Sequence, residues 1–226
     1  MLKGLFQGSV LIALMVTSQV SYSHEGAALG ERIATQGLGE VTACIICHGD
    51  AGQGNAQAGY PRLAGLPQAY LEDQLAHFLT ERRISTVMSL QDKALNPEQR
   101  TAVAAWFAQL PAQGSFTGGT DQKKLEKGER LAVHGDWRAG LSAGIPACVQ
   151  CHGPGARGVG TAFPPLAGQN ERYIHDQIKA WRDGRRSADP LGMMQVIAER
   201  LSEQQIAAVA AWLAQQPVIP HKEPAE

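Results

Sequence analysis

The four cysteines carry the clearest chemistry in this chain, because each pair is followed at once by a histidine. The pattern is Cys-x-x-Cys-His, and it occurs twice. Two thiols at this spacing can form thioethers with the two vinyl groups on one edge of a porphyrin, and the adjacent imidazole then lies under the iron. The pattern therefore predicts two sites of covalent haem attachment. The residues are Cys44, Cys47 and His48 in the first motif and Cys148, Cys151 and His152 in the second.

Two other uses of these cysteines have to be weighed. Two Cys-x-x-Cys pairs can together bind one zinc ion, but the pairs must then meet in space. A disulfide within each pair also fits the spacing, but it leaves the following histidine unexplained, and the strand and helix pattern of a thioredoxin-like site is missing. Haem attachment accounts for all the cysteines and for both histidines.

Methionine is the next residue type that can bind haem iron. A neutral thioether opposite the imidazole completes a six-coordinate iron and raises its reduction potential, as in electron-carrying cytochromes. Counted back from the Ala-Ala-Trp segment near the end of each half, Met194 takes the same position as Met88. We therefore predict Met88 as the sixth ligand of the first iron and Met194 as that of the second, with Met193 as the alternative to Met194.

Both motifs belong to an internal repeat that covers most of the chain. Pro-x-Leu-Ala-Gly, Tyr-x-x-x-Gln, Arg-Arg and Ala-Ala-Trp follow Cys-x-x-Cys-His in the same order in each half. A stretch rich in Pro, Gly and Ser separates the halves and is typical of a linker. The repeat predicts two copies of one small domain, at residues 24–112 and 121–226, joined by a linker at 113–120.

Each half shows helical patterning and helix caps, and no convincing alternation of a strand. Asn96 with Gln99, and Ser202 with Gln205, have the spacing of a capping box. The fold class is therefore all-α, with three main helices around each haem and irregular loops between them. The expected helices cover residues 27–36, 67–81 and 97 onward in the first half, and 121–134, 170–183 and 203 onward in the second.

Residues 1–23 have the features of a secretory signal peptide. Lys3 is followed by an apolar run at 10–16 and by Ser21-Tyr22-Ser23, which offers small residues for cleavage before His24. The run is well short of the roughly 20 residues that span a bilayer. We therefore expect export to the periplasm and removal of residues 1–23. The sequence leaves open whether the mature protein is free in solution or loosely attached to a membrane.

Charge and composition exclude some functions. With 20 Lys and Arg against 21 Asp and Glu, the formal net charge is −1, and a nucleic-acid-binding protein would normally show a clustered basic excess. Aromatic residues make up 6% of the chain, so two small helical domains have few large side chains to fill their cores. A haem in each half would supply that volume.

Together, these motifs resemble the dihaem cytochromes c4 of the class I cytochrome c superfamily, over about residues 26–217. The resemblance implies two cytochrome c folds related by a pseudo-twofold axis, with two covalently bound haem c groups near the domain interface. It also implies that the carbonyl groups of Pro61 and Pro164 accept hydrogen bonds from the rings of His48 and His152, which would orient each ligand.

Each half also carries an Arg-Arg pair between its middle helix and its methionine. Guanidinium groups at this point can pair with haem propionates, whereas the alternative for each is an ordinary solvated helix end. Tyr70 and Tyr173 are expected to pack on the haem edge or to bridge the domains, and the alternative for each is plain packing in the core of its own half. The four candidate arginines are Arg82, Arg83, Arg185 and Arg186.

The predicted function is electron transfer, not catalysis. A periplasmic dihaem cytochrome would pass single electrons between respiratory complexes, for example from a bc1-type complex or a dehydrogenase to a terminal oxidase. Reaction with a small molecule at haem iron would need an open sixth position, and each half offers a methionine there. The expected partners are other redox proteins, with no small-molecule substrate and no nucleic acid. The alternative is the electron-accepting cytochrome subunit of a periplasmic dehydrogenase or haem enzyme complex.

Overall fold

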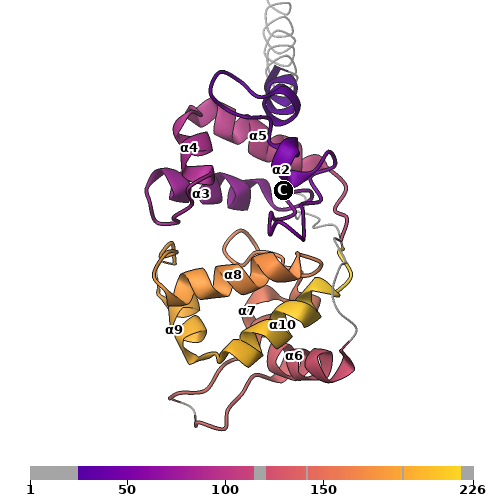
Figure 1. The fold of residues 1–226 in the computed structure, drawn as a ribbon, viewed down its shortest axis with the longest axis vertical. Helices are drawn as coiled ribbons and strands as arrows, with labels where there is room; N and C mark the ends of the chain where they lie inside the picture. The colour runs from indigo at the N-terminus through magenta and orange to yellow at the C-terminus, as the bar shows by residue number, and fades with distance from the viewer. Residues whose placement is uncertain (1–24, 115–120, 141, 190, 220–226) are drawn as a thin grey trace, which may run out of the picture.

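The computed structural model describes residues 25–114, 121–140, 142–189 and 191–219. In these ranges the fold is all-α, as predicted, and the extended segments form only isolated bridges. Two helical halves are stacked along the long axis of the molecule (Figure 1). The predicted signal peptide at 1–23 lies outside the described residues, as do residues 115–120 of the predicted linker.

Both halves follow the same order of helices. The first half contains a helix over residues 25–36, α2 (Ile45–His48), α3 (Gln68–Leu79), α4 (Met88–Lys93) and α5 (Pro97–Gln109). The second half contains α6 (Gln122–His134), α7 (Cys148–His152), the 3-10 turn η1 (Pro154–Ala156), α8 (Glu171–Arg182), α9 (Met193–Arg200) and α10 (Glu203–Ala214). The three longest helices of each half are those that the sequence predicted.

Short helices are the main difference from the sequence prediction. The segments between the long helices were expected to be irregular, but both haem motifs form short helices, and α4 and α9 begin at the methionines. The helix expected over 67–81 ends at Leu79, because Glu81 has a left-handed φ of 58°. Both predicted capping boxes are present, at Asn96 and at Ser202.

A close crossing of the first and last helices organises each half. Gly30 lies against α5, where an added Cβ would stand 2.2 Å from the carbonyl oxygen of Ala102. Gly128 lies against α10 in the same way, and its Cβ would stand 2.1 Å from the oxygen of Ala208. Only glycine allows the two backbones to approach so closely. Each half then buries its own apolar core beside this crossing.

The surface along which the two halves meet, which we call the seam, contains α3 and α8 facing each other (Figure 1). Backbone groups pair directly across it. The N–H of Ile84 donates to the carbonyl of Arg185 at 2.8 Å, and the N–H of Ser187 donates to the carbonyl of Arg82 at 2.7 Å. These two bonds tie the equivalent loops of the two halves together in antiparallel fashion.

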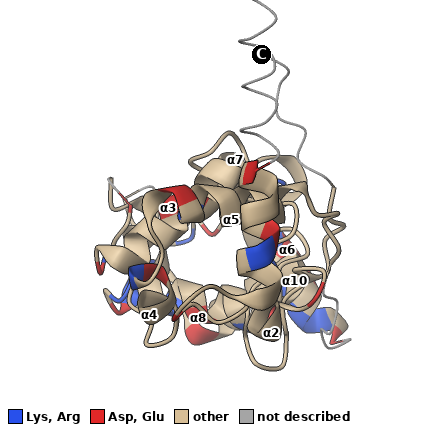
Figure 2. Cartoon of the chain, turned by 90° about the horizontal axis from the view of Figure 1, so that it is seen from above, with Lys and Arg blue, Asp and Glu red and all other residues tan. Residues whose placement is uncertain are grey.

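Charged residues of both signs surround the stacked halves. In the view along the long axis, segments with Lys and Arg are interspersed with segments with Asp and Glu (Figure 2). Within the described ranges, none of the helices has the length and apolar character that crossing a membrane requires.

Candidate haem sites

The two haem motifs form short helices, α2 and α7, that pack into their own halves. Cys44 packs against the core of the first half and Cys148 against that of the second, so the two cysteine pairs do not meet. All four cysteines are free thiols. Burial raises the pKa of both Cys44 and Cys148 to about 11, so these thiols are neutral rather than the nucleophilic thiolates of a redox-active pair.

The motif histidines are buried and locked in orientation. His48 is 6% exposed, and its Nδ1 lies 2.9 Å from the carbonyl oxygen of Pro61. His152 is 8% exposed, and its Nδ1 lies 2.8 Å from the carbonyl oxygen of Pro164. Because a carbonyl can only accept, Nδ1 must carry the proton. In the neutral ring this leaves the lone pair on Nε2, the nitrogen available to a metal.

Both rings are held in the neutral form that metal binding requires. Burial is the largest cause that lowers the pKa of His48 and of His152, and the contact with the proline carbonyl opposes it. The positive charge of Arg83 lowers the pKa of His48 further, and that of Arg186 does the same for His152. Each half therefore offers one neutral, oriented imidazole beside two thiols.

Met88 and Met194 occupy matching positions in the first turns of α4 and α9. The backbone N–H of Met88 donates to the Ser85 hydroxyl at 3.1 Å, and that of Met194 donates to the Asp189 carboxylate. Met194 packs against the core of the second half, whereas Met193 is 38% exposed. Asp189 lies among the residues by which the second half is longer than the first, so the repeat gave no signal for it.

The Arg-Arg pairs split into one exposed and one buried member. Arg82 and Arg185 are exposed, and their backbone carbonyls make the antiparallel seam contacts. Arg83 and Arg186 are 7% and 8% exposed. The side chain of Arg185 turns back to Asp183 at 3.1 Å.

The two buried arginines share the same two glutamines. Arg83 donates to Oε1 of Gln74 at 3.0 Å and to Oε1 of Gln177 at 2.7 Å. Arg186 donates to Oε1 of Gln177 at 3.1 Å and to Oε1 of Gln74 at 2.7 Å. These four side chains close a hydrogen-bonded cycle across the seam, which we call the seam ring. The Tyr-x-x-x-Gln repeat was visible in the sequence, but nothing there indicated that the glutamines of the two halves would meet.

Tyr70 and Tyr173 lie beside the seam ring and bridge the halves. The hydroxyl of Tyr173 accepts a hydrogen bond from Arg83, and the hydroxyl of Tyr70 lies 3.5 Å from Nη2 of Arg186. In each case the tyrosine and the arginine come from different halves. The bridging role was one of the roles considered from the sequence, beside packing on the haem edge and plain core packing.

A second seam contact was missed because it exists in only one half. Arg62 is 1% exposed, and the side chain of Gln169 pairs with its backbone. The N–H of Arg62 donates to Oε1 of Gln169 at 2.8 Å, and Nε2 of Gln169 donates to the carbonyl of Arg62 at 3.0 Å. The guanidinium of Arg62 donates to the carbonyl of Ala64 at 2.6 Å and to the carbonyl of Ala167 at 3.2 Å. The second half has Pro165 at this repeat position, so the repeat gave no reason to single out Arg62.

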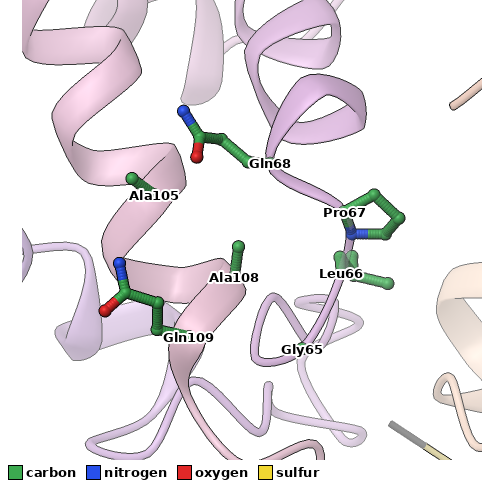
Figure 3. Close-up of a pocket in the computed structure, with 7 residues that line it drawn as sticks. All are labelled: Gly65, Leu66, Pro67, Gln68, Ala105, Ala108 and Gln109. Atoms are coloured by element: carbon green, nitrogen blue, oxygen red, sulfur yellow. The ribbon is translucent and has the colours of Figure 1, made fainter. Parts of the chain in front are cut away.

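A hollow of about 240 Å³ lies between the start of α3 and the end of α5 (Figure 3). None of the candidate cysteines, histidines or methionines lines it, so it is separate from the haem sites. Its walls are Gly65, Leu66, Pro67, Gln68, Ala105, Ala108 and Gln109.

The donor set of each half therefore fits a haem c group: free thiols at the attachment spacing, one oriented neutral imidazole and one methionine held by its backbone. The family model described as "Cytochrome c" matches residues 27–111 and 126–217, one copy in each half. The chain belongs to the cytochrome c family. Its tandem arrangement is that of the dihaem cytochromes c4, which confirms the resemblance seen in the sequence.

Individual relatives agree with this assignment. The chain is 51% identical over 183 residues to a "Thiosulfate dehydrogenase electron acceptor" of Thiomonas intermedia, covering 81% of this chain and 82% of that one. It is 31% identical over 206 residues to a cytochrome c4 of Pseudomonas aeruginosa, covering 90% of this chain and 96% of that one.

Solved structures place the same fold over most of the chain. The reduced cytochrome c4 of Pseudomonas stutzeri superposes with a TM-score of 0.71 at 27% identity, covering 84% of this chain and 97% of that one. The thiosulfate dehydrogenase TsdBA of Marichromatium purpuratum gives a TM-score of 0.79 at 38% identity, and it covers 84% of this chain but only 40% of that longer one. This cytochrome is thus a dihaem electron carrier with haem c covalently bound in each half.

Proposed function

We propose that this cytochrome accepts electrons from a thiosulfate dehydrogenase and passes them to the next redox protein. The observation that carries the proposal is the pattern of similarity. The chain is 51% and 41% identical to two thiosulfate dehydrogenase electron acceptors, against 36% and 31% for two cytochromes c4. A carrier between other respiratory complexes is the alternative function within the same fold.

The proposed ligands follow the repeat and the geometry of each half. His48 and Met88 would bind the first iron, and His152 and Met194 the second, while Pro61 and Pro164 hold the imidazoles. Met194 is preferred to Met193 because it packs inward. When bound, haem iron supplies reversible one-electron exchange, and two protein ligands on each iron leave no position for a substrate. The proposed thioether cysteines are Cys44, Cys47, Cys148 and Cys151.

Among the arginines, Arg83 and Arg186 are the proposed partners of the haem propionates. Both are buried cations, and within the described ranges their side chains donate to neutral oxygens and not to a carboxylate. Arg82 and Arg185 are exposed, and we assign their side chains to the surface instead.

The proposed location is the periplasm, after removal of residues 1–23. Amino-terminal sequencing of the mature protein would find His24 first if cleavage occurs as expected. Retention of residues 1–23 in the purified protein would contradict it.

The decisive experiment uses the mature ferric protein with both haems attached. It is mixed with thiosulfate and a catalytic amount of the Thiomonas thiosulfate dehydrogenase, and haem reduction is followed by visible absorbance. We expect two electrons to be taken up per chain, and no reduction by thiosulfate without the dehydrogenase. The haem content and the methionine–iron charge-transfer band are measured on the same sample.

Two results would contradict the proposal in different ways. Reduction by thiosulfate alone would show that this chain takes electrons from thiosulfate directly, without a dehydrogenase as its donor. Failure of the dehydrogenase to reduce a protein that exchanges electrons normally with a small-molecule reductant would favour a carrier for another donor.

A further inference from the structure

A single peptide group joins the motif histidine of the first half to a side chain of the second half. The carbonyl oxygen of the peptide between Pro61 and Arg62 accepts from Nδ1 of His48 at 2.9 Å. The N–H of the same peptide donates to Oε1 of Gln169 at 2.8 Å. The three groups therefore form a continuous chain of hydrogen bonds across the seam, from the His48 ring through the peptide to Gln169.

Burial and further contacts fix the Gln169 amide in this chain. Gln169 is 3% exposed and Arg62 is 1% exposed. Nε2 of Gln169 donates to the carbonyl of Arg62 at 3.0 Å, and the backbone N–H of Asn170 donates to Oε1 of Gln169 at 3.0 Å. Because the amide oxygen receives two backbone N–H groups while the amide nitrogen faces a carbonyl, Gln169 acts as an acceptor toward the peptide that holds His48.

Hydrogen bonds in series polarise one another. When Gln169 accepts from the peptide N–H, electron density in that peptide shifts toward its carbonyl oxygen, which becomes a better acceptor for the imidazole proton. A stronger hydrogen bond from Nδ1 of His48 makes the imidazole a more basic ligand through Nε2. An electron-rich ligand favours ferric over ferrous iron, so the chain of hydrogen bonds acts to lower the reduction potential of the first haem.

The second half cannot form the equivalent chain. Nδ1 of His152 lies 2.8 Å from the carbonyl oxygen of Pro164, but the next residue is Pro165, whose backbone nitrogen carries no proton. The peptide that holds His152 therefore has no N–H to donate. Leu66, which cannot accept a hydrogen bond through its side chain, stands at the repeat position of Gln169. The two halves thus carry the same motif histidine but differ in the group behind it.

We propose that Gln169 is a positioning residue for the imidazole of the first haem alone. It acts across the seam through the peptide between Pro61 and Arg62, and it lowers the reduction potential of the first haem. The inference rests on the proposed ligation of the first iron by His48. A side chain of the second half thereby sets the electron affinity of the first half, and no path of this kind runs in the opposite direction through Pro164.

The test is Gln169→Leu, which removes the acceptor without changing the charge and copies Leu66 of the other half. The midpoint potential of the first haem should rise by an amount equal to about a threefold change in the ferrous-to-ferric ratio, about 28 mV at 59 mV per tenfold change. The midpoint of the second haem should stay. Met88→Ala identifies the first haem, because its midpoint is the one that this substitution displaces.

Proton NMR of the reduced protein reports on the hydrogen bond itself. In Gln169→Leu the ring N–H signal of His48 should move upfield, because a weaker hydrogen bond deshields the proton less, while that of His152 should stay. Haem content and the methionine–iron charge-transfer band are measured on each variant, so that a lost ligand is not mistaken for a weakened hydrogen bond.

Asn170→Ser is the matched control. Nδ2 of Asn170 donates to the carbonyl of Tyr60 at 2.6 Å, and its Oδ1 accepts from the N–H of Tyr173 as the N-cap of α8. Serine keeps a capping oxygen but is too short to hold the Tyr60 carbonyl as well. It therefore loosens the same segment from the second half and leaves the bonds of Gln169 in place. Both midpoints should stay close to those of the parent.

Three results would overturn the inference. In a Gln169→Leu protein with two haems and an intact charge-transfer band, the first midpoint and the His48 ring signal could stay unchanged, or both midpoints could shift equally. Alternatively, Asn170→Ser could shift the first midpoint as much as Gln169→Leu does, which would make the effect one of a loosened segment.

A second variant covers the case in which Gln169→Leu fails to take up haem. Gln169→Met has nearly the length of glutamine and only a weak acceptor, so it should give the same rise in the first midpoint and is judged by the same three results. Failure of the proposed function is separate. A dehydrogenase that does not reduce the parent protein leaves these potentials as they are, whereas a parent without two reversible one-electron midpoints is no dihaem carrier.

Discussion

At the scale of single residues, the environment of a side chain separates neighbours that the sequence leaves equivalent. Met193 and Met194 are adjacent and chemically identical, but only Met194 packs against the core of the second half. Its backbone is fixed by Asp189, just as Ser85 fixes that of Met88. The second haem should therefore take its thioether from Met194.

Replacing each methionine by alanine tests this assignment. Met194→Ala and Met88→Ala should each remove about half of the methionine–iron charge-transfer absorbance per chain and lower one midpoint potential, because a thioether ligand raises the potential. Met193→Ala should leave the band intact and serves as the matched control. The near-infrared spectrum of the ferric protein, where this band lies, shows which methionine binds the second iron. Loss of the band in Met193→Ala, with Met194→Ala unaffected, would reverse the assignment.

At the scale of helices, the crossing at Gly30 depends on the missing side chain. Gly30→Ala would place a Cβ 2.2 Å from the Ala102 oxygen, so the helices must separate. We expect a loss of about 1–3 kcal/mol in the free energy of unfolding. Gly26→Ala, in the same helix with nothing within 4 Å of its Cβ, should change stability by no more than about 0.5 kcal/mol. Denaturant unfolding of the holoprotein measures the free energy of unfolding of both variants. Equal losses in the two variants would show that the helix crossing accommodates a Cβ at position 30.

The helix that begins at Met88 is held by a buried ion pair that the second half lacks. Nε of Arg100 on α5 lies 2.6 Å from a carboxylate oxygen of Asp92, which is 0% exposed. The same repeat positions in the second half hold Ala198 and Ile206, both fully buried. The same two repeat positions thus hold an ion pair in one half and apolar side chains in the other.

This difference predicts a strongly non-additive pair of substitutions. Arg100→Ala leaves a buried carboxylate without its partner and should cost about 3–5 kcal/mol of stability. The double variant Asp92→Ala with Arg100→Ile copies the second half and should recover most of that loss, because an apolar pair can replace a buried ion pair at little cost. Denaturant unfolding of the holoprotein gives both values. A double variant as unstable as Arg100→Ala would show that the first half cannot accept apolar packing there.

At the scale of the whole molecule, the sequence predicted the features that depend on neighbouring residues or on the internal repeat. The Cys-x-x-Cys-His spacing and the capping box at Asn96 depend on residues a few positions apart, and the repeat extended them to both halves. Helices as short as α4 were missed because six residues are too few to show a helical period. The seam was missed because it joins residues about a hundred positions apart, and nothing in an Arg-Arg pair tells which arginine will be buried.

The seam should make the two halves unfold as one unit, and substitution of Gln169 should weaken it. Its side chain, 3% exposed, holds both backbone polar groups of Arg62. Gln169→Ala leaves these buried groups without partners, at about 1–3 kcal/mol each. Scanning calorimetry of the holoprotein should then resolve two transitions where the parent shows one. Gln195→Ala, at an exposed position on α9, should keep the single transition. If Gln169→Ala also kept one transition at the parent temperature, the backbone pairing at Ile84 and Ser187 would suffice to join the halves.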